Sequence, residues 1–259
     1  MDKLDLSVTI ICHNETNNLS RLLKSVSFAS EVIVVDDHST DKSAEIATQL
    51  GAKVFQHDFE GFGQQKNYAA SKASHDWILS LDCDEEVTVE LYQSIKEMIS
   101  SGDSQHIFAV DRKTYFLNQF IRFGGWYPDR VARLYRKTKA SFTEPQVHEV
   151  LLSKDGQNPV LLQGSLNHFS FPTIASQVER NLKYAKLGAI EYVSKHGRPS
   201  IFALFFRPFW KFIECLILKA GILDGMAGLI IAFNASYSMF MKYSFAYSDF
   251  SKDRKSIGE

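Results

Sequence analysis

The first 104 residues alternate short apolar runs with segments of helical periodicity, and this order limits the possible folds more than any other feature. A strand–helix order repeated in this way is typical of a doubly wound α/β fold. We expect a mostly parallel, Rossmann-like sheet flanked by helices, with ligands bound at the carboxyl ends of the strands. The expected strands are Leu6–Cys12, Glu31–Val35, Lys53–Gln56 and Trp77–Leu81, and the expected helices are Asn18–Val26, Ser43–Leu50, Gly63–Ala73 and Thr88–Ile99.

The pattern changes from about residue 105 onward, where short strands alternate with polar or aromatic loops and extend the sheet as a mixed one. After Pro172 the sequence becomes helical. We therefore expect one domain over residues 1–172, with halves 1–104 and 105–172, and a helical C-terminal extension over 173–259. The strands expected here are Ile107–Arg112, Val131–Tyr135, Val147–Leu152 and Val160–Leu162, and the helices are Thr173–His196, Pro199–Ala220 and Gly225–Tyr247.

Charge is distributed unevenly along the chain. The 29 Lys and Arg and the 30 Asp and Glu give a net charge of −1, yet residues 1–104 carry 8 basic and 18 acidic side chains. Residues 105–140 carry 8 basic and 2 acidic side chains, and residues 195–259 carry 9 and 5. Such asymmetry can indicate anionic partners for the basic stretches, although solvated charge without a partner is the alternative.

Targeting signals are weak. The acidic start Met1–Asp5 and the short apolar run Val8–Cys12 argue against a secretory signal. The longest uncharged run, Gly225–Met241, has 17 residues and falls short of the roughly 20 that a spanning helix needs. The 3 cysteines show neither disulfide nor metal spacing, which favours a reducing compartment. We therefore expect a cytoplasmic protein without a membrane-spanning helix.

Two acidic clusters follow expected strands, at the edge of the sheet where a ligand should bind. Val34–Asp41 places Asp36 and Asp37 where a carboxylate can accept hydrogen bonds from a ribose hydroxyl or a base N–H. The hydroxyl residues that follow can instead cap the next helix. Leu79–Glu86 holds four carboxylates in five positions. Their repulsion predicts a divalent cation, Mn²⁺ or Mg²⁺, that bridges them to phosphate.

Three motifs in this order resemble those of the family 2 glycosyltransferases, which have the GT-A fold. Ser7–Glu15 resembles their first strand and Asn-Glu turn, Val35–Asp41 their nucleotide-binding motif and Asp82–Asp84 their metal motif. Further segments resemble a short bacterial branch that adds glucose to the inner core of lipopolysaccharide. These segments are Gly61–Asn67, Gly124–Asp129, Val147–Glu149 and Arg207–Trp210. The resemblance implies that residues 1–104 form the nucleotide-sugar half of a GT-A catalytic domain and residues 105–172 the acceptor half.

The resemblance also implies roles for matched positions. Asp37 would contact the uracil, Asp82 the ribose and Asp84 a metal ion on the diphosphate. Lys66 would neutralise charge on the nucleotide, unless it is an ordinary exposed helix lysine. Glu15 would lie near the nucleotide, although it can also be a helix-start carboxylate.

Family members invert the anomeric centre in a single displacement, so a base must accept the proton of the attacking hydroxyl. Glu149 and Asp129 are the candidates. We favour Glu149 because strand-forming valines surround it, whereas Asp129 follows Pro128 and can simply shape a turn or bind the acceptor. His168 is a candidate ligand of the metal or the diphosphate, with a core histidine as the alternative.

Basic and aromatic residues alternate between residues 105 and 140. Such a mixture can bind nucleic acid. It can equally bind a phosphorylated sugar acceptor, with Arg on phosphate and aromatic rings on the pyranoses. The glycosyltransferase motifs favour the second interpretation, so we assign Arg130, Arg133 and Trp126 to the acceptor and expect no nucleic-acid partner.

The C-terminal helices mix aromatic residues with cations between Phe202 and Lys219, a composition suited to peripheral contact with an anionic membrane. Packing on the catalytic domain or on a second subunit is the alternative. What the resemblance implies is therefore a metal-dependent inverting hexosyltransferase at the cytoplasmic face of the bacterial inner membrane. The expected donor is a nucleotide sugar, UDP-glucose, and the expected acceptor a phosphorylated glycolipid, through a heptose of the lipopolysaccharide core. Transfer to a polyprenyl phosphate or another envelope glycan, or a non-catalytic glycan-binding module, are the alternatives.

Overall fold

The computed structural model describes residues 3–102, 104–144 and 149–256, with side chains through Ser248 in the last stretch. Its contacts group the chain into two compact units. The first unit comprises residues 1–113 and 129–168, and the second comprises residues 114–128 and 169–259. The structure thus groups residues 114–128 with the C-terminal helices, whereas the boundary expected from the sequence lies at residue 172.

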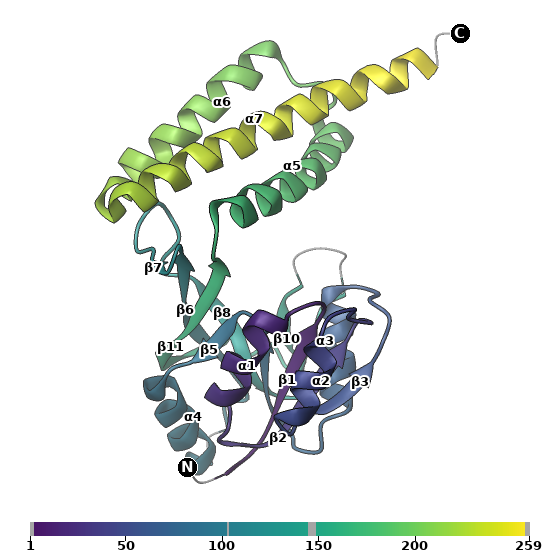
Figure 1. Ribbon diagram of the computed structural model, residues 1–259, viewed down its shortest axis with the longest axis vertical. Coiled ribbons are helices and arrows are strands. Elements are labelled where there is room, and N and C mark those ends of the chain that lie inside the picture. The colour runs from purple at the N-terminus through teal and green to yellow at the C-terminus, as the bar shows by residue number, and fades with distance from the viewer. Residues whose placement is uncertain (1–2, 103, 145–148, 257–259) are drawn as a thin grey trace. The chain divides into compact units, whose positions relative to one another are not determined.

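The N-terminal strands form the parallel part of the sheet in the first unit (Figure 1). Cys12 pairs with Asp36 and Ile11 with Asp82, so the carboxyl ends of three strands reach one edge together. In spatial order the strands are β3 (Lys53–Gln56), β2 (Ala29–Asp36), β1 (Leu4–Cys12) and β4 (Trp77–Asp82). The helices that connect them and follow them are α1 (Thr16–Ser25), α2 (Ser43–Gln49), α3 (Phe62–Ser71) and α4 (Val89–Ser101). All eight elements were expected from the sequence, with ends that differ by a few residues.

The strands beyond β4 bring antiparallel pairing into the sheet. β8 pairs with both β4 and β6, and β5 pairs with β11, so the expected mixed sheet is confirmed. Beyond β4 the order is β8 (Arg130–Arg136), β6 (Ile107–Phe116), β11 (Val160–Phe171) and β5 (Glu85–Val87), with β7 (Gln119–Phe120) on β6 and a separate pair of β9 (Ala140–Phe142) and β10 (Leu151–Ser153). The expected strand Val147–Leu152 begins only at Leu151: the expectation is wrong at Glu149 and Val150, which lie in a loop, and Val147 and His148 lie outside the described residues. The expected strand Val160–Leu162 continues to Phe171.

Apolar side chains of the central strands pack on both faces of the sheet. In β2, Val34 joins one buried cluster while Ile33 and Val35 join another, as the two-residue repeat of a strand requires. Leu22 of α1 packs in the first cluster and Ala69 of α3 in the second. This layered packing fixes the strand ends, and hence the acidic residues that follow them.

Helices make up most of the second unit (Figure 1). Thr173 caps α5, since its hydroxyl accepts the Ser176 N–H at 3.1 Å, and Ser200 caps α6 in the same way. The long α7 packs along both α5 and α6. The elements are α5 (Ile174–His196), α6 (Ile201–Ile213), the π-helical turn η1 (Glu214–Leu218), the 3₁₀ turn η2 (Gly221–Asp224) and α7 (Gly225–Ser256).

Residues 114–128 are bonded to the turn between α6 and α7. The buried Asp224 carboxylate accepts the backbone N–H of Arg122 at 3.2 Å and of Phe123 at 2.8 Å. The N–H of Gly124 donates to the carbonyl of Lys219 at 2.8 Å. These bonds explain why this segment belongs to the helical unit.

One stretch among the described residues, Gly221–Ser248, has the length and apolar composition of a membrane-crossing helix. The sequence expectation missed it because it counted only the uncharged run Gly225–Met241. The observation is weak by itself, because the central helices of soluble proteins have the same properties. Ile231, Ala232 and Ala246 of α7 are buried inside the helical unit, whereas the apolar window as a whole is 28% buried.

Candidate functional site

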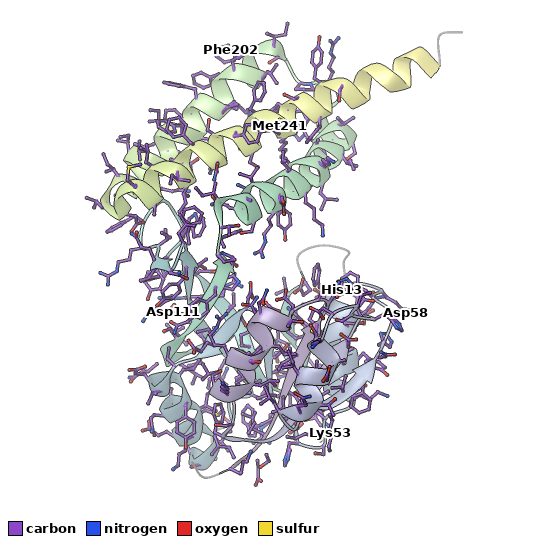
Figure 2. All side chains as sticks on the ribbon, viewed as in Figure 1. His13, Lys53, Asp58, Asp111, Phe202 and Met241 are labelled. Carbon is purple, nitrogen blue, oxygen red and sulfur yellow. The ribbon has the colours of Figure 1, made fainter. Side chains whose placement is uncertain are left out.

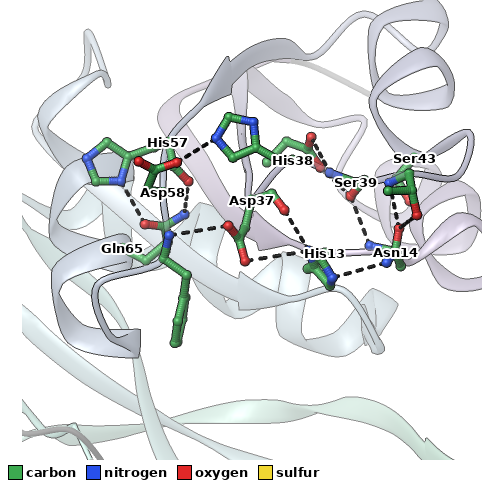
Figure 3. A network of polar contacts seen from close by, with 12 residues as sticks. His13, Asn14, Asp37, His38, Ser39, Ser43, His57, Asp58 and Gln65 are labelled. Atoms are coloured by element: carbon green, nitrogen blue, oxygen red, sulfur yellow. Dashed lines mark hydrogen bonds and ion pairs between the residues drawn. The ribbon is translucent and has the colours of Figure 1, made fainter.

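Asn14 joins the ends of β1 and β2 (Figure 3). Its side-chain oxygen accepts the backbone N–H of Thr40 at 2.8 Å and of Asp41 at 3.3 Å, and its own N–H donates to the Ser39 hydroxyl at 2.9 Å. Asn14 has φ 55°, a left-handed conformation that Asn adopts more readily than most residues. The loop after β2 is therefore held against the loop after β1.

Several polar residues of the first acidic cluster have structural roles. The buried Asp36 accepts the N–H of Ser39 at 3.0 Å, and Asp41 accepts the N–H groups of Thr16 and Ser43 at 3.2 and 2.9 Å. Burial works to raise the pKa of Asp41, but the hydrogen bonds from Ser43 and Thr16 outweigh it and hold that pKa well below its usual range. These residues build the loop.

Asp37 differs from the buried Asp36 because its carboxylate stays partly exposed, at 30%. One oxygen accepts the N–H of Phe59 at 3.3 Å, and the other lies 3.5 Å from Nδ1 of His13 (Figure 3). This position suits the expected contact with a base. Glu15 lies at the start of α1 and accepts a hydrogen bond from the Asn18 amide at 2.8 Å, so the structure also fits its helix-start alternative.

A network of charged side chains lies at the end of β4. Arg133 places one terminal nitrogen 2.5 Å from Asp82 and 2.6 Å from Glu85. Lys66 of α3 lies 3.2 Å from Asp82 and 2.7 Å from Glu149. Arg133, Lys66 and Glu85 are buried, whereas the Asp82 side chain is 31% exposed. The network therefore fixes the Asp82 carboxylate in place and leaves it partly accessible to a ligand.

The contacts within this network shift the pKa values of Asp82 and Arg133. Burial would raise the pKa of Asp82, but the cations Arg133, Lys66 and Arg112 hold it well below its usual range. Burial would likewise lower the pKa of Arg133, and the carboxylates of Asp82 and Glu85 raise it instead. Asp82 is therefore an anion at any physiological pH.

Lys66 is not an ordinary exposed helix lysine, because it is buried and contacts both Asp82 and Glu149, the latter 83 residues further along the chain. The structure thus brings together a residue expected at the donor and the favoured candidate base. Gly63, also on α3, lets this helix lie close to the backbone of Thr143, because a Cβ at position 63 would lie 1.9 Å from the Thr143 carbonyl oxygen. His148, which the sequence places beside Glu149, lies outside the described residues.

The second candidate base, Asp129, is held by Arg112. Two guanidinium nitrogens of Arg112 each lie 2.8 Å from one carboxylate oxygen of Asp129. In addition, the backbone N–H of Arg112 donates to the backbone carbonyl of Asp129 at 2.7 Å. Arg112 also lies 3.6 Å from the buried Glu85. Sequence analysis assigned no role to Glu85 or Arg112, although both stand in segments that it singled out for their charge.

The three residues expected to bind an acceptor lie in different surroundings. Arg130 is exposed and lies 3.3 Å from Asp111, a position open to a ligand. Arg133 is buried with its charge directed at Asp82 and Glu85, so its position corrects the sequence assignment: it holds the strand-end carboxylates. Trp126 belongs to the second unit, where it packs on Phe171 with ring centroids 5.5 Å apart.

Asp84 and His168, the two candidate metal ligands, lie close together. Nε2 of His168 lies 3.3 Å from a carboxylate oxygen of Asp84, and both side chains are largely buried. The antiparallel pairing of β11 with β5, which sets His168 opposite Glu85, produces this approach. Within the part of the chain that the structure describes, no group of three or more His, Cys, Asp and Glu is arranged to hold a metal ion.

The fold and the site define a class of protein. A sheet whose parallel strands lead into Asp37, Asp82 and Asp84, and whose antiparallel part adds His168, has the architecture of a GT-A glycosyltransferase. The family model described as Glycosyl transferase family 2 matches residues 7–153. This match covers more than half of the chain, and the protein belongs to that family.

Relatives are similar over almost the whole chain. An uncharacterized glycosyltransferase of Rickettsia felis is 29% identical over 92% of this chain and 87% of its own. The lipopolysaccharide core biosynthesis glycosyltransferase LpsC of Rhizobium meliloti is 26% identical over 93% of this chain and 94% of its own.

Solved structures are similar at lower identity. Residues 1–349 of S. aureus TarS in complex with UDP-GlcNAc are 17% identical, covering 96% of this chain and 92% of that one, with a TM-score of 0.48. Glucosyl-3-phosphoglycerate synthase from Mycobacterium tuberculosis, in complex with Mn²⁺, UDP and glucosyl-3-phosphoglycerate, is 20% identical over 42% of this chain and 44% of that one, with a TM-score of 0.35.

Proposed function

We propose that this glycosyltransferase transfers glucose from UDP-glucose to a heptose of the lipopolysaccharide core, with inversion at the anomeric carbon. Support for the acceptor class comes from the name of the LpsC relative, which matches this chain from end to end at 26% identity. Support for the chemistry comes from one observation: Lys66 holds Asp82 and Glu149 within 3.2 Å of its ammonium group.

On the donor side, Asp37 and Asp82 are partly exposed carboxylates, Asp37 directly after β2 and Asp82 at the end of β4, and these two strands flank β1 in the sheet. Asp37 would accept a hydrogen bond from the uracil, and Asp82 from a ribose hydroxyl. Lys66 and Arg133 keep Asp82 ionised and fixed in orientation, so it accepts without reorganising.

A divalent cation would neutralise the leaving diphosphate, and Asp84 with His168 would hold it. One carboxylate oxygen and one imidazole nitrogen, 3.3 Å apart, suit Mn²⁺ better than Mg²⁺, because Mg²⁺ strongly prefers oxygen ligands. Two protein ligands also leave room for phosphate oxygens.

Glu149 would act as the base. Its carboxylate would accept the proton of the acceptor hydroxyl as that hydroxyl attacks the anomeric carbon, opposite the leaving diphosphate. Lys66, whose ammonium nitrogen lies 2.7 Å away, fixes the position of this carboxylate. Asp129 is less suited to the role because Arg112 engages it from two nitrogens.

The acceptor is amphiphilic, so we also propose that the protein works in the cytoplasm, at the inner face of the bacterial inner membrane. The exposed Arg130 would contact an acceptor phosphate. The second unit would make the membrane contact, since it is the part with the large exposed apolar side chains of α6 and α7.

The proposal is tested with the purified protein, a panel of UDP-sugars and core oligosaccharide extracted from a strain that lacks the gene. Mass spectrometry should show one added hexose with UDP-glucose in the presence of Mn²⁺, and none with EDTA. Transfer only to polyprenyl phosphate, or no transfer to any acceptor, would refute it.

A further inference from the structure

The helix α6 exposes an aromatic stripe, which consists of Phe202, Phe205, Phe206, Phe209 and Trp210. Their spacing places them on one face of the helix. A helix of a soluble protein normally buries such a face. Here each of the five is at least 47% exposed, and Pro208 is the one buried residue of α6, all of which the structure describes. Figure 2 shows the side chains of this helix, with Phe202 labelled near its start.

The exposed apolar surface continues over the turn into α7. Ile217 and Leu218 of η1, Ile222 and Leu223 of η2, and Met226 of α7 are each more than half exposed. Together with the aromatic stripe they form ten large exposed apolar side chains within 25 residues of sequence. Contiguous surfaces of this size mark a contact with another molecule or with lipid.

The acidic residues near this surface are either paired with lysines or buried. Residues 201–241 contain two acidic residues, Glu214 and Asp224. Glu214 lies 3.1 Å from Lys211 and 2.6 Å from Lys219, and Asp224 is buried on backbone N–H groups. The exposed charged residues of this segment are Arg207 and Lys219, both cations.

The two units also carry net charges of opposite sign. The second unit holds 13 Lys and Arg against 7 Asp and Glu, a formal +6, and the first unit holds 16 against 23, a formal −7. A protein partner would be expected to meet a rim of both signs. Aromatic side chains whose exposed charged neighbours are cations instead complement the interface of an anionic bilayer.

We propose that the aromatic stripe of α6 and the apolar turn into α7 insert into the headgroup region of an anionic lipid bilayer. This inference rests on the membrane contact proposed above and adds the inserting residues and the dominant force. Buried apolar area, rather than charge alone, holds the protein on the bilayer, so attachment survives ionic strengths that screen Arg207 and Lys219.

The test is flotation of the full chain with vesicles of phosphatidylglycerol and phosphatidylethanolamine, in 0.1 M and in 1 M NaCl. The wild type should float at both salt concentrations. Phe202→Ser with Phe209→Ser should lower the bound fraction at least about tenfold at both. The matched control, Leu187→Ser with Ile190→Ser on the exposed face of α5, should bind like the wild type. Arg207→Gln should weaken binding about fivefold at low salt and not at high salt.

The inference would be overturned if 1 M NaCl released the wild type completely, or if the double aromatic variant floated as well as the wild type. It would also be overturned if the wild type did not float with the vesicles at all. Light scattering would identify a second copy of the chain as the occupant if the double variant changed a dimer into a monomer without any vesicle binding. Circular dichroism and the unfolding midpoint show whether the variants are folded. Transfer to water-soluble core oligosaccharide is measured in parallel, so a failure of the proposed function is distinguished from a failure to bind lipid.

Discussion

Replacing Arg133 with methionine removes a buried cation that contacts both Asp82 and Glu85. Glu85 is fully buried, and among the described residues Arg112, at 3.6 Å, is the one remaining cationic partner, so its charge would be poorly compensated. Breaking a buried ion pair in this way typically destabilises a protein by about 3–5 kcal/mol. Asp82 is 31% exposed and can be hydrated again, so we expect a loss near the lower end, about 3 kcal/mol.

Urea unfolding monitored by tryptophan fluorescence measures this loss. The matched double variant, Arg133→Met with Glu85→Gln, removes the unpaired charge and keeps an oxygen for the Asp82 N–H that Glu85 accepts at 3.0 Å. We expect it to recover most of the lost stability. The double variant thereby separates the buried charge from a simple packing defect.

The pH dependence gives a second check on the same network. The folded-state pKa of Asp82 lies below its ordinary value of 3.8, so the stabilisation is complete above that value and is lost as the pH falls below it. The difference in unfolding free energy between Glu85→Gln and the double variant Arg133→Met with Glu85→Gln isolates the contact of Arg133 with Asp82. It should therefore be constant from pH 7 to about 5 and shrink below about pH 4. A single-variant loss under about 1 kcal/mol, or a double variant no more stable than the single, would refute the reasoning.

Three further predictions concern the base, the metal and the helical unit. Glu149→Gln should lower turnover by about 10²–10⁴-fold and leave UDP-glucose binding intact, as calorimetry and UDP release will show; near-normal turnover would exclude Glu149 as the base. Asp84→Asn should weaken Mn²⁺ binding in the presence of UDP at least about tenfold by calorimetry, and unchanged affinity would exclude Asp84 as a ligand. Gly228→Ala places a Cβ 1.8 Å from the carbonyl oxygen of Gly221 and should lower the thermal midpoint, whereas Gly188→Ala meets only the flexible end of Lys242 at 3.3 Å and should not.

The strands and helices of the N-terminal half were predictable because their periodicity is local. The short strand β5 was missed because Glu85 and Glu86 look like loop carboxylates in sequence, and β11 supplies their pairing from about 80 residues away. The same distance in sequence explains why the length of β11 was underestimated.

Residue types at the site were predictable, but burial was not. Asp37, Asp82 and Asp84 follow strands, and their position at the edge of the sheet follows from the parallel order. The role of Arg133 depends on β8 lying next to β4, a pairing that the local sequence does not record. One signal was present: Arg133 stands within an expected apolar strand, where an unpaired cation would be costly.

The attachment of residues 114–128 to the helical unit has a consequence for the inheritance of this architecture. The N–H groups of Arg122 and Phe123, which donate to Asp224, come from a segment encoded between two strands of the catalytic sheet. Because part of the helical unit is encoded inside the catalytic sequence, we do not expect it to be gained, lost or exchanged as a separate C-terminal domain. Deleting residues 173–259 would leave those donors without their acceptor and expose the apolar cluster around Phe116 and Ile121. Catalytic sheet and C-terminal helices are expected to have diverged as one inseparable sequence.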